Sequence, residues 1–471
     1  MICWATSEMQ GAALWDRRCN RSMARICERR FELPHVSFSR ACGPDARQAA
    51  HRIFSHAKTT VPGLLAGHFQ QTHARCQAER SQHPGQRLLV VQDTTVFKYT
   101  SHPATEGLGP VHTSEKGRGL LSHAAIALPR SGPPLGVVHL SIWARDPAHH
   151  GKRRNAAART RDPIEIKESQ KWIDGVWGAE STLPDCPLLV ICDREADIFE
   201  LFAAPRKAQT DLLVRSRHPR RVLVDEDTDE DADEDAAPVP LADALGAAPM
   251  LGTIAVQVPR APKRPARVAH LQLRVRKVTL KPPTTLPPPL DGSRHPYQTL
   301  FAIEARETGA AVAEPIHWVL LTTMPVRTAD EAQEMLRCYT RRWVIEDVHL
   351  VLKSGLRAEQ LQFDDAHSLQ NALAALYVVA WRVVQTRDTA RFFPDAPAAQ
   401  LVTAEEQQIL EAAEARPLPT ARDVTRAIAH LGGFPRYRSA GEPGVRSLCA
   451  GLQRLEGMLV GWRLAHRTSQ L

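Results

Sequence analysis

The chain has 471 residues, of which 43% are hydrophobic and 24% are charged, a composition typical of a globular protein with room for about two or three domains. It carries a net charge of +8 and has no continuous apolar run long enough to predict a membrane span. The first residues lack the pattern of a secretory signal, and nine scattered cysteines without a C-x-x-C pair favour free thiols in a reducing cytoplasm over disulfides or a zinc site.

Charge is unevenly distributed along the chain. Residues 225–235 carry nine acidic and no basic side chains, so the remainder of the chain has a net charge of +17. A positive surplus of this size favours a polyanionic partner, nucleic acid first, although an arginine-rich solvated surface from a GC-rich genome would give the same total. The acidic run itself is typical of a solvated loop, or of a DNA mimic that discourages non-specific binding.

Residues 1–75 are predicted to form a small helical module, because SMARICERRF and DARQAAHRIFSHA have apolar residues at helical spacing. The first predicted helix pair is basic, with arginines at positions 17, 18, 21, 25, 29 and 30. This pattern indicates either a DNA-binding surface, with Arg17 and Arg18 as candidate contacts, or an amphipathic pair that caps the next domain.

Residues 76–385 contain the strongest strand signals. Short apolar runs bounded by polar turns occur in RLLVVQD, GLLSHAAIAL, PLGVVHLSIWA and PLLVICD. Such runs are typical of strands buried on both faces of an α/β or mixed sheet. KESQKWIDGVWGA and EADIFELFAAP have helical spacing, so the sequence predicts an α/β domain here.

Two of the apolar runs end in an aspartate, Asp93 in QDTT and Asp193 in CDREADIFE. An acidic side chain at the end of a buried strand points into the crevice outside the sheet, where α/β proteins place ligands. A single aspartate at such a place is usually a turn or helix-capping residue. Two of them in a basic chain favour ligands for a hard divalent cation such as Mg²⁺.

Residues 211–325 are predicted to be a β-rich insertion, interrupted by acidic and proline-rich surface loops. This block separates the two aspartate-tipped strands from the helical segment that follows it. Residues 386–471 have helical spacing again, with proline-containing loops and a basic end.

The segment from 339 to 353 combines an apolar majority with a narrow polar stripe. At about 100° per residue, four polar side chains fall within roughly 80° of one another: Arg342, Glu346, His349 and Lys353. We therefore expect a helix that is buried on most sides and presents one polar stripe to a cleft. The stripe alone is also compatible with ordinary ion pairs between successive helical turns.

Three carboxylates form a candidate catalytic trio: Asp93, Asp193 and Glu346. Such a trio can hold two divalent cations about 4 Å apart across a scissile phosphate, with Mg²⁺ expected and Mn²⁺ as a substitute. Tyr339, Arg342 and Lys353 would then bind neighbouring phosphates. The histidines have no metal-ligand spacing that we identify, and we interpret them as structural or phosphate-binding.

Three motifs, in order along the chain, resemble those of DDE transposases of the insertion-sequence-four family. QDTT resembles the family's first-aspartate motif and CDREADIFE its second, and Tyr339-x2-Arg342-x3-Glu346-x6-Lys353 has the spacing of its Y-R-E-K signature. The segments KESQKW, VRSRHPR, HWVLLTTMPV, AIAHLGGF, GAALWDRR and ACGPDARQAAHRIF resemble other parts of the family, so the resemblance covers nearly the whole chain. Trp15 departs from the pattern, because related proteins often have a glycine there.

The resemblance implies an α/β fold with an RNase H-like core, a mixed sheet with helices interrupted by the β-rich insertion. We expect a DNA-binding domain over residues 1–75, a catalytic domain over 76–385 and a dimerisation region over 386–471. The implied partners are double-stranded DNA, as inverted-repeat transposon ends and as target, and a second copy of the chain in a synaptic complex. The expected location is the bacterial cytoplasm, in association with the nucleoid, with no membrane partner.

The resemblance also implies cut-and-paste chemistry. Water nicks one strand, the freed 3′-OH attacks the opposite strand to form a hairpin, water reopens the hairpin, and the 3′-OH then attacks target DNA. A hairpin forms more easily if a base leaves the stack and is held on an aromatic ring. Trp318 matches the family tryptophan that takes this base, and Arg215 and Arg217 are candidate phosphate binders. The competing interpretation is a core tryptophan and ordinary surface arginines.

Two other functions stay open at this point. One is a catalytically silent DNA-binding regulator derived from a transposase, and the other is a general metal-dependent nuclease. The complete carboxylate trio and Y-R-E-K set argue against the first, and the helical regions at both ends argue against the second. All three functions predict DNA binding, so DNA binding alone does not separate them.

Overall fold

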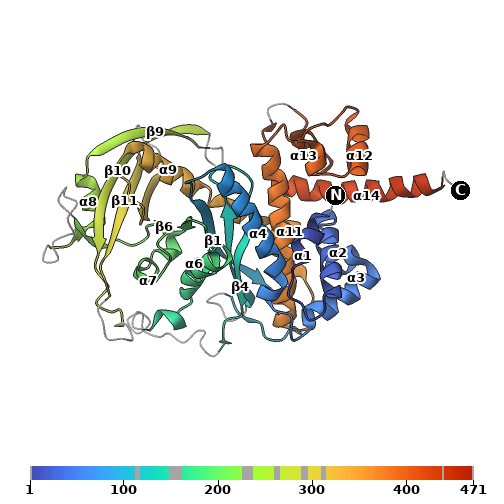
Figure 1. Ribbon diagram of the computed structural model, residues 1–471, viewed down its shortest axis with the longest axis horizontal. Coiled ribbons are helices and arrows are strands. Elements are labelled where there is room, and N and C mark those ends of the chain that lie inside the picture. The colour runs from blue at the N-terminus through green and yellow to red at the C-terminus, as the bar shows by residue number, and fades with distance from the viewer. Residues whose placement is uncertain are drawn as a thin grey trace.

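The computed structural model is a mixed α/β protein with a twelve-stranded, mostly antiparallel sheet in the part of the chain that it describes. The sheet occupies one side of the molecule, and helices from both ends of the chain gather on the other (Figure 1). The described residues are 3–111, 117–147, 162–224, 237–258, 266–287, 295–308, 315–437 and 440–468. The acidic run 225–235 lies outside them, so its predicted loop stays a prediction. No helix of the described segments is long and apolar enough to cross a membrane.

The strands are β1 (Leu88–Lys98), β2 (Gly109–Pro110), β3 (Arg118–Leu128), β4 (Gly136–Trp143), β5 (Leu188–Cys192), β6 (Thr210–Arg215), β7 (Arg221–Val224), β8 (Val239–Pro240), β9 (Met250–Val258), β10 (Arg267–Leu280), β11 (Gln298–Glu307) and β12 (His317–Thr322). The α-helices are α1 (Trp4–Met9), α2 (Arg18–Glu32), α3 (Phe38–Ser55), α4 (Val61–Gln82), α6 (Gln170–Thr182), α7 (Phe199–Ala203), α8 (Leu241–Ala247), α9 (Ala329–Thr340), α10 (Trp343–Leu350), α11 (Ala366–Phe392), α12 (Ala404–Glu414), α13 (Ala421–Leu431) and α14 (Val445–Thr468). Short 3-10 segments η2 (Ile164–Ile166), η3 (Arg194–Ala196), η5 (Ala358–Gln360) and η6 (Ala398–Gln400) and the π-helical turn η4 (Val351–Gly355) complete the description.

The centre of the sheet is made by the apolar runs that the sequence predicted as strands. β3 pairs antiparallel with both β1 and β4, whereas β1, β5 and β6 run parallel to one another. The residues of β5 are all buried, and so are nearly all of β3. This matches the prediction of strands covered on both faces, because a continuous apolar run has no side that tolerates water.

β1 continues beyond the end that the sequence predicted. Asp93 lies in the middle of this strand and pairs with Ala124 of β3, so its predicted position at a strand tip is wrong. The strand continues because the residues after Asp93, beginning with Thr94, are mostly β-branched and suit an extended chain. The parallel pairing of β1 with β5 nevertheless ends at Val91. Asp93 therefore lies just beyond the point where β5 leaves β1.

The β-rich block extends the central sheet. β12 pairs with β6, and β11, β10 and β7 follow outward in the same sheet, with β9 on β10. α8 packs against β7 and β10 in this outer part (Figure 1), and α9, which follows β12, contacts β9 and β10. The insertion and the central strands therefore form one continuous sheet, which the sequence pattern alone did not show.

Helix α11 is the element against which both ends of the chain pack. It is buried along most of its length and contacts α2, α3 and α4 on one side and α10, α13 and α14 on others. Its sequence is apolar nearly all round, which is the pattern of a buried helix. The predicted domain boundaries at residues 75 and 385 fall inside α4 and α11, so continuous helices join the predicted domains.

A buried polar network fixes α1 to α4 and to strand β4 of the sheet. The Glu8 carboxylate accepts hydrogen bonds from His68 Nδ1 at 2.6 Å and from Arg75 Nη1 at 2.6 Å. His68 Nε2 accepts from the backbone N–H of Val137 in β4, which makes the imidazole a neutral Nδ1–H donor to Glu8. Burial opposes ionisation of Glu8, but His68 and Arg75 hold its pKa below the ordinary value of 4.5.

We expect Glu8→Ala to lower the free energy of unfolding by about 3 kcal/mol at pH 7, because it leaves the buried Nδ1–H of His68 without an acceptor and the Arg75 guanidinium without its counter-ion. The ionised carboxylate stabilises the fold above pH 4.5, and this contribution is lost as the pH falls through the lower native pKa. Urea denaturation followed by circular dichroism, at pH 7 and at a pH well below 4.5, measures the difference in free energy of unfolding between Glu8→Ala and the wild type. Glu79→Ala, which removes a half-exposed pair with His83, is the control. A loss below about 1 kcal/mol, the range of exposed pairs, would contradict the role of Glu8.

Candidate active site

The segment that carries the polar stripe is a helix with two breaks. α9 begins at a capping box formed by Thr328 and Glu331, and α10 starts immediately after Arg342. The π-helical turn η4 closes with the Leu356 N–H donating to the Val351 carbonyl at 2.7 Å. Such π-helical turns are rare and occur frequently at functional sites.

The predicted burial of this segment is confirmed for most apolar positions, including Ile345 and Val348. Trp343 is the exception, because its side chain is 59% exposed. It is the first residue of α10, where the chain changes direction after Arg342, and the Arg342 guanidinium lies 5.5 Å from the centre of its ring. The expectation that Trp343 belongs to the buried face is therefore wrong, and an exposed indole stands beside the polar stripe.

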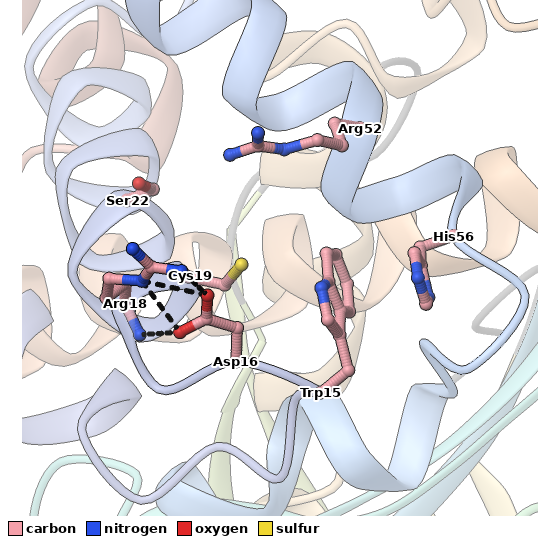
Figure 2. Close-up of a pocket in the computed structure, with 7 residues that line it drawn as sticks. All are labelled: Trp15, Asp16, Arg18, Cys19, Ser22, Arg52 and His56. Atoms are coloured by element: carbon pink, nitrogen blue, oxygen red, sulfur yellow. Dashed lines mark hydrogen bonds and ion pairs between the residues drawn. The ribbon is translucent and has the colours of Figure 1, made fainter.

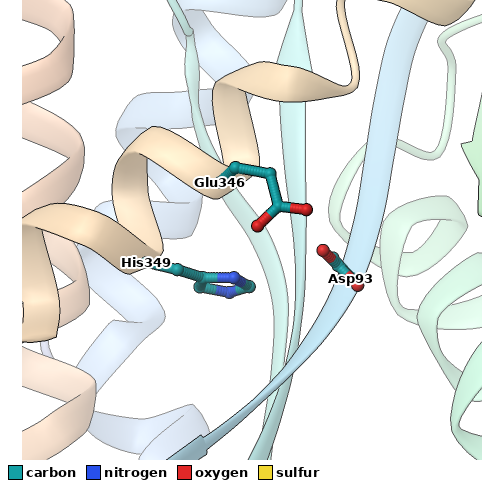
Figure 3. A group of neighbouring side chains, drawn as sticks. All are labelled: Asp93, Glu346 and His349. Atoms are coloured by element: carbon teal, nitrogen blue, oxygen red, sulfur yellow. The ribbon is translucent and has the colours of Figure 1, made fainter. Parts of the chain in front are cut away.

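The structure brings Asp93 and Glu346 together. One carboxylate oxygen of each and one ring nitrogen of His349 lie within 4.8 Å of one another. Figure 3 shows Asp93 reaching from β1 towards Glu346 and His349, which project from the same helix. Asp93 is nearly buried, with 13% of its side chain exposed, whereas 42% of the Glu346 side chain is exposed. The pair is thus open to solvent from one side.

Arg342 lies between the two carboxylates. Its Nη1 donates to Asp93 Oδ2 at 3.2 Å, and Nη1 and Nη2 both lie 3.4 Å from Glu346 Oε1. Only 11% of the Arg342 side chain is exposed. The ion pair between Arg342 and Glu346 was one of the predicted interpretations, and it coexists with the carboxylate cluster.

The electrostatic environment of Asp93 favours a cation. Burial and the charge of Glu346 raise the pKa of Asp93 to about 7, although Arg342 opposes the shift. The charge of Asp193 raises the pKa further, which places that carboxylate within electrostatic range. Because the two neighbouring acids repel the ionised form, a bound divalent cation would relieve a repulsion that Arg342 only partly offsets.

Asp193 follows the last residue of β5 and has a second task. It is the N-cap of η3, and its Oδ1 accepts the backbone N–H of Glu195 at 2.8 Å. Asp193 does not belong to the group within 4.8 Å formed by Asp93, Glu346 and His349. The capping role that the sequence left open for a lone aspartate is therefore real, and the complete trio stays a prediction.

His349 is a residue of this group that the sequence interpretation missed. It lies one helical turn after Glu346 on the polar stripe and is buried, and its Nε2 has no hydrogen-bond partner within the described structure. Burial, followed by the charges of Lys353 and Arg342, lowers the pKa of His349 to about 3. The available signal was the Glu-x-x-His spacing itself, which places both side chains on one helix face.

Four of the predicted DNA contacts lie around the carboxylate pair: Trp318, Tyr339, Arg215 and Lys353. The rings of Trp318 in β12 and Tyr339 in α9 meet edge to face with 5.9 Å between centroids. Arg215 in β6 hydrogen-bonds Tyr339, and burial raises the pKa of this phenol. Lys353 lies on the other side of Glu346, 5.9 Å from the centre of the Phe97 ring, and burial lowers its pKa.

Arg217 lies at the edge of a pocket of about 330 Å³ whose lining also includes Arg194, Arg215 and His218. The buried Asp197 carboxylate fixes this turn, because it accepts the backbone N–H groups of Arg217 at 2.7 Å and His218 at 3.2 Å. Asp197 belongs to CDREADIFE, so the second aspartate motif also shapes the neighbouring basic turn. The sequence interpretation did not identify this role.

Arg18, one of the two predicted N-terminal contacts, lines another pocket, of about 490 Å³. Trp15 stacks on His56 with 3.8 Å between ring centroids and an angle of 8° between planes, while Arg18 and Arg52 line the same pocket (Figure 2). Arg17 is exposed at the start of α2, and Arg18 pairs with Asp16.

Two arginines of the predicted basic helix pair, Arg29 and Arg30, have structural roles. Arg30 is buried and donates to the carbonyl groups of Val36 at 2.6 Å and Leu356 at 2.7 Å. Arg29 forms an ion pair with Glu456 of α14 at 2.6 Å. Arg30 therefore does not belong to a basic surface, whereas Arg29 stays partly exposed with its charge paired. The contacts of α2 with α11 and α14 fit the alternative of an amphipathic pair that caps the next domain.

We expect Asp93→Asn to stabilise the metal-free protein at pH 8. Because the native pKa of Asp93 is raised, the native state binds its proton more tightly, and stability falls as the pH rises from the ordinary value of 3.8 to about 7. The asparagine cannot ionise, so the free energy of unfolding should rise by roughly 1–3 kcal/mol at pH 8 and change little at pH 4.

Thermal and urea unfolding in EDTA at the two pH values measure this difference. Asp330→Asn, at an exposed carboxylate in the first turn of α9, is the control. Addition of Mg²⁺ should reduce the advantage of Asp93→Asn, because the cation offsets the same repulsion. If Asp93→Asn were less stable than the wild type at pH 8, the repulsion between Asp93 and Glu346 would be contradicted.

Comparison with known proteins supports a DNA-binding role for the first part of the chain. Residues 1–59 match the family model described as Transposase DNA-binding, and all residues that line the pocket of Figure 2 lie within this segment. Among solved structures, the chain is similar to a piggyBac transposase in a synaptic complex with hairpin DNA, at 8% identity over 80% of this chain and 67% of that one. The TM-score of 0.35 is too low for an argument about fold or mechanism. The match over residues 1–59 supports a DNA-binding transposase.

Proposed function

We propose that this protein is a cut-and-paste DDE transposase of the insertion-sequence-four family. It would bind the inverted-repeat ends of a mobile element and cut and rejoin DNA by metal-dependent phosphoryl transfer. The observation that carries the proposal is the meeting of Asp93 with Glu346. Arg342, which bonds both carboxylates, is 249 positions from Asp93 in the sequence. The first 59 residues of the same chain match a transposase DNA-binding family. The mixed sheet with its β-rich extension before α10 is compatible with the RNase H-like core that the resemblance implies.

The residues of the cluster fit a divalent cation. Two carboxylates lie within ligand distance of one another, and their mutual repulsion favours a positive charge between them. Asp93 and Glu346 would hold Mg²⁺ or Mn²⁺, and Asp193 would share a second ion after release of its cap on η3. When bound, such ions lower the pKa of an attacking hydroxyl and stabilise the charge on the departing oxygen.

The side chains around the two carboxylates would bind the DNA backbone. Arg342 has a planar guanidinium that can exchange the two carboxylates for two phosphate oxygens once a cation and DNA arrive. Lys353 acts as a point charge on the other side of Glu346, and Tyr339 donates its hydroxyl to a phosphate next to Arg215. The exposed Trp343 offers an aromatic face at the same site.

The proposed sequence of steps is nicking, hairpin formation, hairpin opening and strand transfer. Each is an attack of a hydroxyl oxygen on phosphorus with departure of the opposite oxygen, so one site suffices for all four. Arg17 and Arg18 would bind the ends of the element together with Arg52 of the N-terminal pocket, whereas the region 386–471 would join two copies in the synaptic complex. The site of action would be the bacterial nucleoid in the cytoplasm.

The decisive experiment incubates the purified full chain with Mg²⁺ and DNA that carries the terminal repeats flanking its own gene. We expect nicked and hairpin-ended products, and a loss of at least about 100- to 1000-fold in Asp93→Ala, Asp193→Ala and Glu346→Ala, because each removes a group that stabilises the transition state. Asp330→Ala is the matched control, since this carboxylate is exposed and lies on the preceding helix. Cleavage that survives any of the three substitutions would overturn the assignment of that residue.

The alternative function, a catalytically silent regulator, has a separate outcome in the same experiment. Specific binding of the repeats without cleavage in Mg²⁺ or Mn²⁺ would support it and would exclude the transposase. Cleavage of DNA regardless of its end sequence would instead indicate the general nuclease.

Trp318 allows the hairpin step to be tested apart from nicking. We expect Trp318→Ala to reduce hairpin formation about tenfold or more, because stacking of a base on an aromatic ring contributes about 1–3 kcal/mol, and to leave first-strand nicking nearly unchanged. Trp318→Phe should recover part of the loss. The control is Trp177→Ala, a partly exposed tryptophan on α6. Equal loss in both steps would refute a flipped-base role for Trp318.

A further inference from the structure

His349 is a buried histidine with two properties that a structural histidine does not need: a ring nitrogen close to two carboxylates and an unpartnered Nε2 within the described structure. It is buried in α10, one ring nitrogen lies within 4.8 Å of oxygens of Asp93 and Glu346, and its Nε2 has no hydrogen-bond partner among the residues described. In Figure 3 the imidazole extends from the helix towards Asp93, on the same side as the Glu346 carboxylate. A buried polar nitrogen without a partner is costly and calls for an explanation.

The chain shows elsewhere how it accommodates a buried histidine that has only a structural role. His123 in β3 is fully buried, and its two ring nitrogens lie within 2.9 Å of Thr94 Oγ1 and Gln92 Oε1. His349 also packs its ring edge to face against Tyr377, with 6.4 Å between centroids. This packing accounts for the orientation of the ring but leaves Nε2 unpartnered.

The state of the His349 ring suits metal ligation. Its Nε2 has no hydrogen-bond partner in the described part of the chain, so this nitrogen is not engaged by another protein group. Glu346 and His349 are three positions apart on one helix face, and a Glu-x-x-His pair with this spacing is able to ligate one metal centre. Asp93 supplies a third donor from the sheet.

We propose that His349 is a nitrogen ligand of the divalent cation that Asp93 and Glu346 hold. The inference deepens the proposed function and rests on it, since the cation is the one that the proposed reaction uses. A site with two carboxylates and one imidazole favours a first-row transition ion over Mg²⁺, because Mg²⁺ prefers oxygen ligands and water. The site therefore binds Mn²⁺ more tightly than Mg²⁺, and His349 is the reason.

Pulsed electron paramagnetic resonance of Mn²⁺ bound to the full chain tests the ligand directly. We expect ¹⁴N modulation from a coordinated imidazole in the wild-type protein and its absence in His349→Phe, which keeps an aromatic ring of similar size. His123→Gln is the matched control, and the modulation should persist there because His123 already has hydrogen-bond partners for its ring. Circular dichroism establishes that each variant is folded.

Calorimetric titration with Mn²⁺ and Mg²⁺ supplies the second measurement. His349→Phe should weaken Mn²⁺ binding on the order of tenfold or more, which is the effect expected on loss of a group that holds a metal. Mg²⁺ binding should change much less. If His349→Phe does not fold, His349→Gln provides the same test, with retained Mn²⁺ binding and lost ¹⁴N modulation.

Bound Mn²⁺ without ¹⁴N modulation in the wild-type protein, an affinity of folded His349→Phe for Mn²⁺ equal to that of the wild type, or ¹⁴N modulation that persists in His349→Gln would overturn the proposal. So would a failure of the wild-type protein to bind Mn²⁺ at all. These outcomes are distinct from failure of the proposed function, which is decided by DNA cleavage in Mg²⁺. Loss of cleavage in Asp93→Ala together with absent ¹⁴N modulation would leave the transposase standing and remove only the nitrogen ligand.

Discussion

The repulsion between Asp93 and Glu346 is the constraint on which the candidate site depends. Two carboxylates held close together in a partly buried place resist ionisation, as the raised pKa of Asp93 records. Arg342 lies against both and offsets part of this repulsion. An arrangement that is unfavourable without a cation is prepared to bind one, and such strain at a site is typically maintained by the rest of the fold.

The fold maintains this arrangement by fixing the two elements that carry the carboxylates. β1 is held between β3 and β5 in the centre of the sheet, and α10 packs on both β1 and α11. Arg30 of the N-terminal helices donates to the carbonyl of Leu356, the residue that closes the π-helical turn after Lys353. The domain that matches a transposase DNA-binding family is therefore bonded directly to the end of the segment that carries Glu346.

Much of the fold could be predicted from local sequence pattern. The apolar runs are strands, the segments with helical spacing are helices, and the β-rich block lies before α9 as expected. The errors have a common cause, because each concerns a residue whose environment is set by a distant part of the chain. Asp93 lies within a strand because β3 continues to pair beyond it. Trp343 is the exception, since it is exposed at the start of α10, after a local break in the helix. Arg30 is buried because α11 and the Leu356 carbonyl meet it.

The sequence by itself determined the chemistry that the chain carries: which residues are acids and bases, which face of the 339–353 helix is polar, and which motifs resemble a transposase. These properties follow from residue type and helical or strand periodicity, which are local. Only the tertiary structure decided that Asp93 reaches Glu346 and that Asp193 caps η3 outside the group of Asp93, Glu346 and His349. It also decided that His349 brings a ring nitrogen near the carboxylates and leaves its Nε2 without a partner in the described residues. Distances between residues far apart in sequence arise from packing of the sheet against α10 and α11, and no local pattern encodes them.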